Sequence, residues 1–202
     1  MQSDQPRLIL ASQSRFRAAL LAAAGVRVDA MPAHIDEAEI KRAARAEGMS
    51  ADDTAMTLAS LKALRLARQH PDALVIAADQ LLVCGDEWFD KPADLAAAGA
   101  HLRALRGRTH TLVTAVLCQR GPLRVWQHVA RPTLTMRDLS DDFIERYIAS
   151  EGDVLTTTVG AYRIEGPGIQ LFNRIEGEHS AIIGLPLLPL LAFFRQHGVL
   201  TA

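Results

Sequence analysis

The sequence predicts a single α/β domain built around a mixed β-sheet. Segments with the helical spacing of apolar residues alternate with short apolar runs that are typical of buried strands. The 202 residues have a hydrophobic share of 49%, which is enough for one substantial core. No internal repeat or low-complexity linker divides the chain, so we expect one domain over residues 1–202.

The first predicted elements are a short strand over residues 8–11 and a helix over residues 14–25. Ser14 is a fitting N-cap for this helix and Gly25 a fitting stop. Its apolar residues recur at i, i+3, i+4, i+7 and i+8, which defines one face: Phe16, Ala19, Leu20, Ala23 and Ala24.

The middle of the chain predicts a helix, a strand and a hairpin. The helix covers residues 52–69 and begins at Asp52 or Asp53. A buried strand over residues 73–79 is expected to present Asp79 at its C-terminal end. The segment "LLVCGDEWFDKP" predicts a hairpin that turns at Gly85 and Asp86.

The second half predicts further helices and two long β-stretches. A helix over residues 93–105 would have Pro92 near its first turn. The β-stretches cover residues 109–119 and 123–137 and are joined by "RGP". Ser140 is expected to cap a helix that reaches about Ala149, and a closing helix covers residues 186–197.

Composition argues against several classes of protein. The net charge of −1 disfavours a uniformly basic surface, so we expect no stable nucleic-acid partner. Cys84 and Cys118 are far apart and have no neighbours at metal-ligand spacing, which favours a reducing cytoplasm. We expect no signal peptide, and the most apolar segment, residues 181–194, is too short to cross a membrane.

The junction "ILASQSRFRAALL" is a candidate anion site. The beginning of a helix after a strand offers free backbone N–H groups, which attract phosphate. Hydroxyls from Ser12 and Ser14 and the guanidinium of Arg17 would complete such a site. The alternative is that Ser14 only caps the helix while the arginines face water.

Acidic residues and lysines supply a second set of candidates. Asp79 could be a general base or a metal ligand, or it could simply cap a turn. Asp36 and Glu37 form an acidic pair that could help to hold a divalent cation or be solvated. Lysine occurs only at positions 41, 62 and 91, and a compact ammonium suits a polyphosphate site, although a surface lysine is the ordinary alternative.

In this order, these segments resemble the Maf family of nucleoside triphosphate pyrophosphatases, first discussed in connection with septum formation. The resemblance covers about residues 7–197 and rests on "LILASQSRFRAALL", "HIDE", "ASLKA", "VIAADQ", "DKP", "LRGRTHTLVTAV", "VGAYRIEGPGIQLFNRIEG" and "IIGLPL". It implies an elongated two-lobed fold related to the inosine-triphosphate pyrophosphatases, with the substrate in a cleft between the lobes. The implied reaction converts a nucleoside triphosphate and water into a monophosphate and pyrophosphate, assisted by Mg²⁺ or Mn²⁺.

The resemblance also implies roles for individual residues. The family's catalytic Asp corresponds to Asp79 and its two lysines to Lys62 and Lys91. Its phosphate-binding Ser and Arg correspond to Ser12, together with Ser14, and to Arg17. Glu37 matches the family's acidic loop residue, which with Asp79 would hold the metal.

Three further positions resemble the branch of the family that acts on 7-methyl-GTP. They are Phe16, Gln80 and Glu165, where the branch acting on dTTP and UTP has Arg, Thr and Gln. An aromatic face and a carboxylate suit the positive charge of a methylated guanine. Phe16 also fits the apolar face of its helix and could be a core residue.

The sequence departs from the family pattern at two places. Arg15 replaces the usual Pro, and Ala18 replaces a second Arg, so that Arg15 could substitute for the missing charge. The family's link with septation leaves open an alternative function, a nucleotide-binding regulator of cell division without essential catalysis. Family members are often dimers, so a homodimer is a further expectation.

Overall fold

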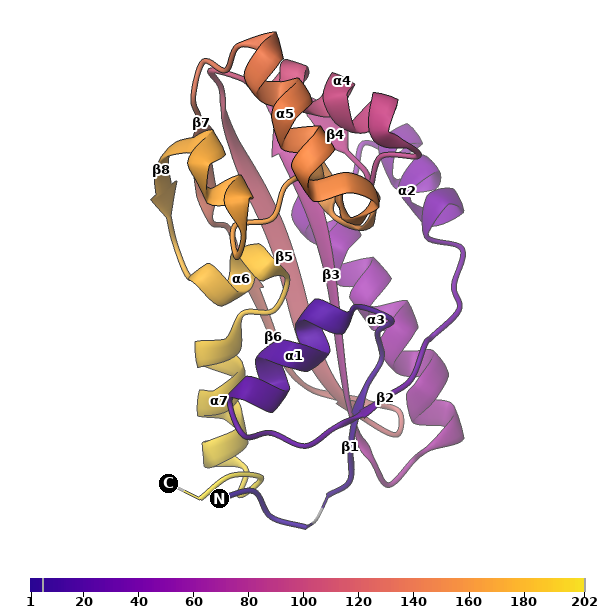
Figure 1. Ribbon diagram of the computed structural model, residues 1–202. Coiled ribbons are helices and arrows are strands. Elements are labelled where there is room, and N and C mark those ends of the chain that lie inside the picture. Colours follow the sequence, from indigo (N-terminus) through magenta and orange to yellow (C-terminus); the bar gives the residue numbers. More distant parts are fainter. Residues whose placement is uncertain (5, 202) are drawn as a thin grey trace.

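The computed structural model describes residues 1–4 and 6–201, and these form one open mixed sheet with helices on both faces (Figure 1). In chain order the elements are β1 (Leu8–Leu10), α1 (Arg15–Ala23), β2 (Asp29–Ala30), α2 (Glu37–Ala46), α3 (Ala51–Gln69), β3 (Leu74–Cys84), β4 (Glu87–Phe89), α4 (Leu95–Leu105), β5 (Thr109–Arg120), β6 (Leu123–Ala130), β7 (Thr133–Met136), α5 (Asp141–Glu151), the short 3₁₀ helices η1 (Gly152–Thr157), η2 (Val159–Ala161) and η3 (Pro167–Leu171), β8 (Phe172–Glu176), α6 (His179–Ile183) and α7 (Leu187–Gln196). The predicted α/β fold with a mixed sheet is confirmed.

Two long antiparallel strands, β3 and β5, form the spine of the sheet and run through the length of the molecule (Figure 1). The strand order is β2-β1-β3-β5-β7-β8, with β4 paired to β3 and β6 paired to β5. Each long strand changes its outer partner along its length. β3 pairs first with β1 and then with β4, while β5 pairs first with β7 and then with β6.

This change of partner leaves a gap at the edge of the sheet. β1 pairs with β3 as far as Ile76, and β4 begins to pair at Leu82. Among the described residues, no strand pairs with residues 77–81 on the side away from β5. Asp79 lies at the middle of this open edge, and a mid-strand side chain is therefore accessible from beside the sheet.

The expectation that the strand ends at Asp79 was wrong. The strand continues to Cys84, because Leu81, Leu82 and Cys84 are buried and extend the apolar run beyond the polar pair. Gly85 at φ +62 then makes the predicted turn into β4.

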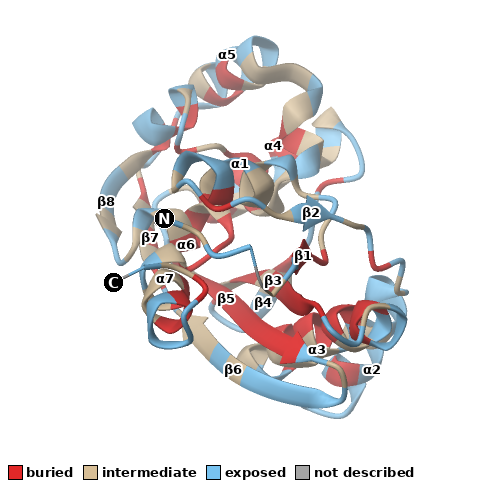
Figure 2. Ribbon diagram, turned by 90° about the horizontal axis from the view of Figure 1, so that it is seen from below, coloured by how far each residue is buried: buried red, intermediate tan, exposed pale blue. Residues whose placement is uncertain are grey.

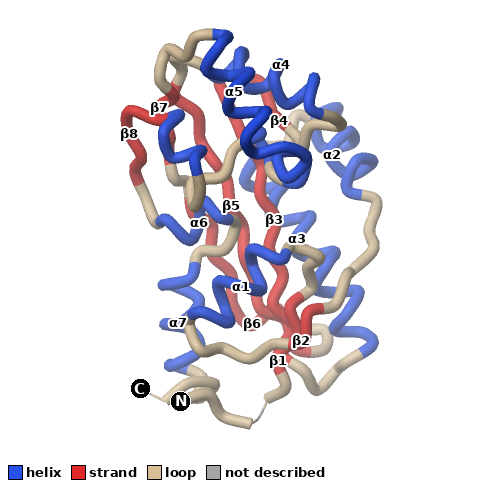
Figure 3. The backbone as a smooth tube through the Cα atoms, viewed as in Figure 1, coloured by secondary structure: helices blue, strands red, loops and turns tan. Residues whose placement is uncertain are grey.

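Side chains of the long strands alternate between two packed layers. One face of the sheet packs against alanines of α3, and the opposite face packs against α1 and α7 (Figure 3). Alanine has so little side chain that α3 lies close to the sheet. The residues in the α3 layer include Val75, Ala77 and Leu117 from the strands and Ala59, Ala63 and Ala67 from the helix. Figure 2 shows that buried residues are concentrated on β3, β5 and the sheet-facing side of α3.

Polar side chains define where the helices begin. Ser14 caps α1 and Ser140 caps α5, as predicted. Two other starts differ from the expectation. Ser50, one residue before the helical run begins, caps α3, while Asp94 caps α4 and leaves Pro92 outside the helix. In both cases a side-chain oxygen accepts a backbone N–H of the first turn, which fixes the start.

Two further elements differ from the sequence-based expectation. The stretch over residues 123–137 is not one strand but β6 and β7, separated at Arg131 and Pro132. Proline has no N–H for the ladder, and the two strands pair with different parts of β5. Residues 37–46, for which the sequence analysis predicts no element, form α2 with Asp36 as its N-cap.

Across residues 1–4 and 6–201, none of the helices is both long enough and apolar enough to traverse a membrane.

Candidate active site

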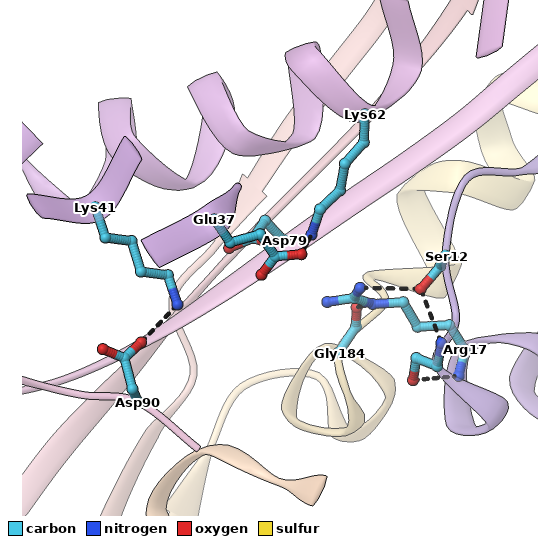
Figure 4. Close-up of polar contacts among 9 residues, drawn as sticks. Ser12, Arg17, Glu37, Lys41, Lys62, Asp79, Asp90 and Gly184 are labelled. Atoms are coloured by element: carbon cyan, nitrogen blue, oxygen red, sulfur yellow. Dashed lines mark hydrogen bonds and ion pairs between the residues drawn. The ribbon is translucent and has the colours of Figure 1, made fainter. Parts of the chain in front are cut away.

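The centre of the site is an ion-pair cluster of one lysine and two carboxylates (Figure 4). Lys62 Nζ lies 2.5 Å from Asp79 Oδ1 and 2.7 Å from Glu37 Oε1. Lys62 comes from α3, Asp79 from the open edge of β3 and Glu37 from the start of α2. The close approach of α3 to the sheet therefore brings the lysine to the strand.

The two carboxylates differ in their surroundings. The Asp79 side chain is 5% exposed and that of Glu37 is 46% exposed. Burial acts to raise the pKa of Glu37, but the positive charges of Lys62, Lys41 and Lys91 outweigh it, and the pKa is lowered. Asp79 Oδ2 is buried and has no hydrogen-bond partner among the described residues. A buried carboxylate oxygen without a donor is costly, which indicates that it meets a ligand, water or cation.

At the β1–α1 junction Ser14 caps the helix as predicted, while Arg17 is half-buried and does not simply face water. Ser14 Oγ caps α1 by accepting the N–H of Arg17 at 3.4 Å. Ser12 Oγ accepts the N–H of Ser14 at 3.1 Å and a guanidinium N–H of Arg17 at 3.3 Å. Arg17 Nε donates to the carbonyl of Gly184 at 2.7 Å, which fixes the guanidinium over the junction (Figure 4). Capping and anion binding are thus compatible roles.

A cleft of about 800 Å³ joins these two groups of residues. Its walls carry six cationic side chains and four carboxylates, which makes it suited to a polyanion such as a polyphosphate. The cations are Arg17, Lys41, Arg42, Arg45, Lys62 and Lys91, and the carboxylates are Glu37, Asp79, Asp90 and Glu165.

Lys91 lines this cleft, and within residues 1–4 and 6–201 no side chain forms an ion pair with it. Part of it is open to solvent, yet burial by the cleft walls and the positive charge of Arg17 lower its pKa. Glu37 opposes this shift. Lys41, by contrast, is held by Asp90 at 2.6 Å (Figure 4).

Phe16 and Glu165 lie at one wall of the cleft with Tyr162 and Ile164. Phe16 is half-buried and faces the cleft, so it is not simply a core residue. The guanidinium carbons of Arg15 and Arg163 lie 5.0 Å and 5.9 Å from the centroid of its ring. The ring is thus already in contact with cations.

Glu165 has one ion-pair partner, Arg163, whose Nε lies 3.9 Å from Glu165 Oε1. Arg163 also pairs with the nearly buried Glu151 at 3.4 Å. The two carboxylates offset the guanidinium charges of Arg163 and of Arg15 beside Phe16, and Glu165 is the carboxylate of the two that lines the cleft.

The positions that depart from the family pattern have different surroundings. Ala18 packs against the core between α1 and α7 and brings no charge to the cleft. Arg15 is exposed and lies against Phe16, so it does not take the place of a second phosphate-binding Arg beside Ser12.

Gln80 lines the cleft, but the N–H groups of its amide are engaged elsewhere. Its Nε2 lies 2.8 Å from Thr114 Oγ1 and 2.9 Å from the carbonyl of Ala181. The sequence analysis missed Thr114 and Gly184, because each acts through a hydrogen bond to a distant segment. It also missed Arg42 and Arg45, which line the cleft from α2. Helical spacing in the residues after "HIDE" could have placed them on the same helix as Glu37.

A metal site made by protein side chains alone is not preformed. No group of three or more His, Cys, Asp or Glu side chains within residues 1–4 and 6–201 is placed to hold a metal ion. Glu37 and the unpartnered Asp79 Oδ2 offer two carboxylates. That number suits Mg²⁺, which is commonly held by one or two carboxylates together with substrate phosphates.

The fold and the site together define an α/β protein with a cationic cleft centred on a buried acidic residue. The chain belongs to the Maf family, since the model for "Maf-like protein" matches residues 7–197. A relative from Granulibacter bethesdensis named nucleoside triphosphate pyrophosphatase is 54% identical over 96% of this chain and 99% of its own length. One from Hyphomonas neptunium with the same name is 55% identical over 95% and 96%. A relative from Rhizobium meliloti named 7-methyl-GTP pyrophosphatase is 47% identical over 98% and 100%.

Proposed function

We propose that this protein is a nucleoside triphosphate pyrophosphatase that cleaves the bond between the α- and β-phosphates. The observation that carries the proposal is the unpartnered Asp79 Oδ2 beside Lys62, in a cleft lined by phosphate-binding groups. The names of the relatives support the same reaction. The sequence's alternative, a non-catalytic regulator of cell division, is not favoured, because these relatives carry the names of enzymes.

In the proposed reaction, water attacks the α-phosphorus and the bond to the bridging oxygen of the β-phosphate breaks. Asp79 Oδ2 accepts the proton of the attacking water, since Oδ1 is already bound to Lys62. Pyrophosphate leaves with the electron pair of the broken bond. Lys91 and Arg17 balance the charge that develops on it.

Ser12, Ser14 and the N-terminus of α1 would bind the phosphate chain with Arg17. Glu37 and Asp79 are the residues that would hold a divalent cation, Mg²⁺ or Mn²⁺, and Asp79 Oδ2 would do so in place of acting as the base. When bound, such an ion supplies positive charge to the phosphates and lowers the pKa of a bound water. Lys62 forms ion pairs with both carboxylates and holds them close together.

We further propose a preference for 7-methyl-GTP. Phe16 offers an aromatic face, and Glu165 offers a carboxylate in the lining of the same cleft. A guanine that carries a positive charge gains from both, whereas neutral guanine gains only stacking. Relatives from Rhizobium meliloti and Brucella abortus that are named 7-methyl-GTP pyrophosphatase support this preference.

We also propose that the chain acts as one domain whose two lobes border the cleft, and that it functions in the cytoplasm, where nucleoside triphosphates are made. A homodimer stays an expectation.

The test is release of pyrophosphate from 7-methyl-GTP, GTP, UTP, dTTP and CTP, each with Mg²⁺ or Mn²⁺. We expect turnover that requires the metal and is fastest with 7-methyl-GTP. Asp79→Asn is the matched control for contaminating activity. Absence of turnover with every nucleotide would contradict the proposed reaction, and faster turnover of UTP or dTTP would contradict only the base preference.

A further inference from the structure

The C-terminal end of α6 is bound by side chains from three other elements. α6 has five residues and ends at Gly184, which has φ +116. The last carbonyls of a helix lack the usual i+4 partner and accept from other donors, and the backbone N–H of Gly184 itself donates to the carbonyls of Ser180 and Ala181. Here the carbonyl of Ala181 accepts from Gln80 and Thr114, that of Ile182 accepts from Gln80, and that of Gly184 accepts from Arg17.

Gln80 and Thr114 act together in this arrangement. They lie opposite each other in the ladder of β3 and β5, the most extensively paired strands of the sheet. Gln80 Nε2 lies 2.8 Å from Thr114 Oγ1, and Thr114 Oγ1 donates to the Ala181 carbonyl at 3.0 Å. Thr114 is fully buried. The pair therefore ties α6 to the rigid spine of the sheet.

The orientation of the Arg17 side chain depends on the Gly184 carbonyl, at the same end of α6. Its Nε donates to the Gly184 carbonyl at 2.7 Å, while a terminal nitrogen reaches Ser12 at 3.3 Å. Side-chain hydrogen bonds at both ends of the guanidinium fix its plane. A helix of five residues is not stable by itself, so its position depends on the contacts that it makes.

We propose that Gln80 and Thr114 are positioning residues for Arg17, acting through the C-terminal carbonyls of α6. This rests on the proposed function, in which Arg17 binds the phosphate chain. The two residues hold Ala181 and Ile182, the following Gly184 is thereby fixed, and its carbonyl orients the guanidinium. Gln80, which the family resemblance links to the substrate, would then serve the phosphate end of the cleft rather than reading the base.

Two substitutions of similar size remove the donors, Gln80→Met and Thr114→Val. The first readout is calorimetric binding of inorganic pyrophosphate in the presence of Mg²⁺, which requires no catalysis. We expect about tenfold weaker binding for Gln80→Met and a smaller loss for Thr114→Val, since one or more hydrogen bonds are lost in each. The second readout is kinetic. KM for 7-methyl-GTP and for GTP should rise by the same factor, so that the ratio of their kcat/KM values is unchanged.

The chain offers matched controls for both substitutions. Gln119 is buried, and its Nε2 donates to the carbonyl of Gly121 at 3.0 Å, away from the cleft. Thr54 is fully buried and donates to the carbonyl of Ser50 at 2.8 Å. Gln119→Met and Thr54→Val should change thermal stability to a similar degree and leave pyrophosphate binding unchanged.

A double-mutant cycle distinguishes positioning from direct contact. In an Arg17→Gln background, Gln80→Met should weaken pyrophosphate binding no further, because its effect passes through the arginine. Additive losses would overturn the proposal, as would a change in the ratio of 7-methyl-GTP to GTP or unchanged pyrophosphate binding by folded Gln80→Met. If Gln80→Met does not fold, Thr114→Val decides by the same measurements. Failure of the unaltered protein to bind pyrophosphate would instead count against the proposed function.

Discussion

Lys62 Nζ lies 2.5 Å from one carboxylate oxygen of Asp79, while the other oxygen of the same carboxylate has no hydrogen-bond partner among the described residues. The two oxygens therefore have different chemical roles. One forms an ion pair with the Lys62 ammonium, which offsets the burial of the carboxylate inside the protein. The other oxygen is available to bind a ligand or water in the cleft.

The first prediction concerns that free oxygen. Asp79→Asn keeps the shape of the side chain but removes the charge and the basic oxygen. We expect pyrophosphate release to fall by about 10³-fold, the scale of a lost general base. Steady-state kinetics with 7-methyl-GTP measures the loss, and circular dichroism checks that the fold is kept. An Asn variant with near-normal kcat would show that Asp79 is not the base.

The second prediction concerns Lys62. Lys62→Met leaves two carboxylates close together without their shared ammonium, and Asp79 is nearly buried. We expect the free energy of unfolding to fall by about 3 kcal/mol. Urea denaturation measures it. Lys41→Met is the matched control, since Lys41 pairs with the exposed Asp90 and should cost less than about 1 kcal/mol. Equal losses for the two variants would contradict the role of burial.

The third prediction concerns Gly184. A Cβ at this position would lie 3.3 Å from Arg17 Nε, and the φ of +116 is unfavourable for any other residue. Gly184→Ala should lower stability by about 1–2 kcal/mol and also weaken pyrophosphate binding, because Arg17 must shift. Gly198→Ala is the matched control. Gly198 has φ +68 with no atom within 4 Å of the added Cβ, so it should lose stability but retain binding.

The fourth prediction concerns the base. Glu165→Gln removes the negative charge beside Phe16 but keeps the size of the side chain. The kcat/KM for 7-methyl-GTP should fall about tenfold relative to that for GTP, since only the methylated base is cationic. The matched control is Glu176→Gln on β8, where the carboxylate pairs with Arg174 at 2.6 Å and is absent from the cleft lining. An unchanged ratio for Glu165→Gln would argue against a charge-based preference.

The fifth prediction concerns His110, whose ring binds Tyr162 at 2.9 Å. Burial lowers the pKa of His110 to about 4 from an ordinary value of 6.5. Between pH 6.5 and pH 4, His110 is therefore protonated in the unfolded chain but stays neutral in the folded protein. Stability from this group is complete above pH 6.5 and falls as the pH drops towards 4, by up to about 3 kcal/mol. His110→Gln does not titrate, so its urea midpoint should fall less between these pH values than that of the unaltered protein.

Much of the fold follows from local signals in the sequence. Ser14 and Ser140 cap helices because their hydroxyls accept N–H groups of the next turn, an interaction within three residues. The hairpin at Gly85 is local as well. The C-terminal end of β3 could not be predicted from such local signals. Asp79 and Gln80 are polar residues inside a strand, tolerated because α3 provides Lys62 for one and α6 provides carbonyls for the other.

The site was predictable where residue type and order carry the information, as for Ser12, Arg17, Lys62 and Lys91, all of which line one cleft. The hydrogen bonds that hold these side chains in place could not be predicted from the sequence. Arg17 and Gly184 are separated by 167 residues, and nothing local in either segment predicts that one binds the other. Such partners are set by the packing of the complete chain.

The continuity of β3 and β5 also limits how the cleft can change width. Both strands run without interruption past Asp79, and their pairing extends over residues 74–83 and 111–120. Within residues 74–83 and 111–120 the ladder has no break, so these two strands provide no hinge beside the cleft. Any narrowing around a nucleotide must come from a change in sheet twist or from movement of attached segments such as α2 and α6. Asp79, on the spine itself, would move least.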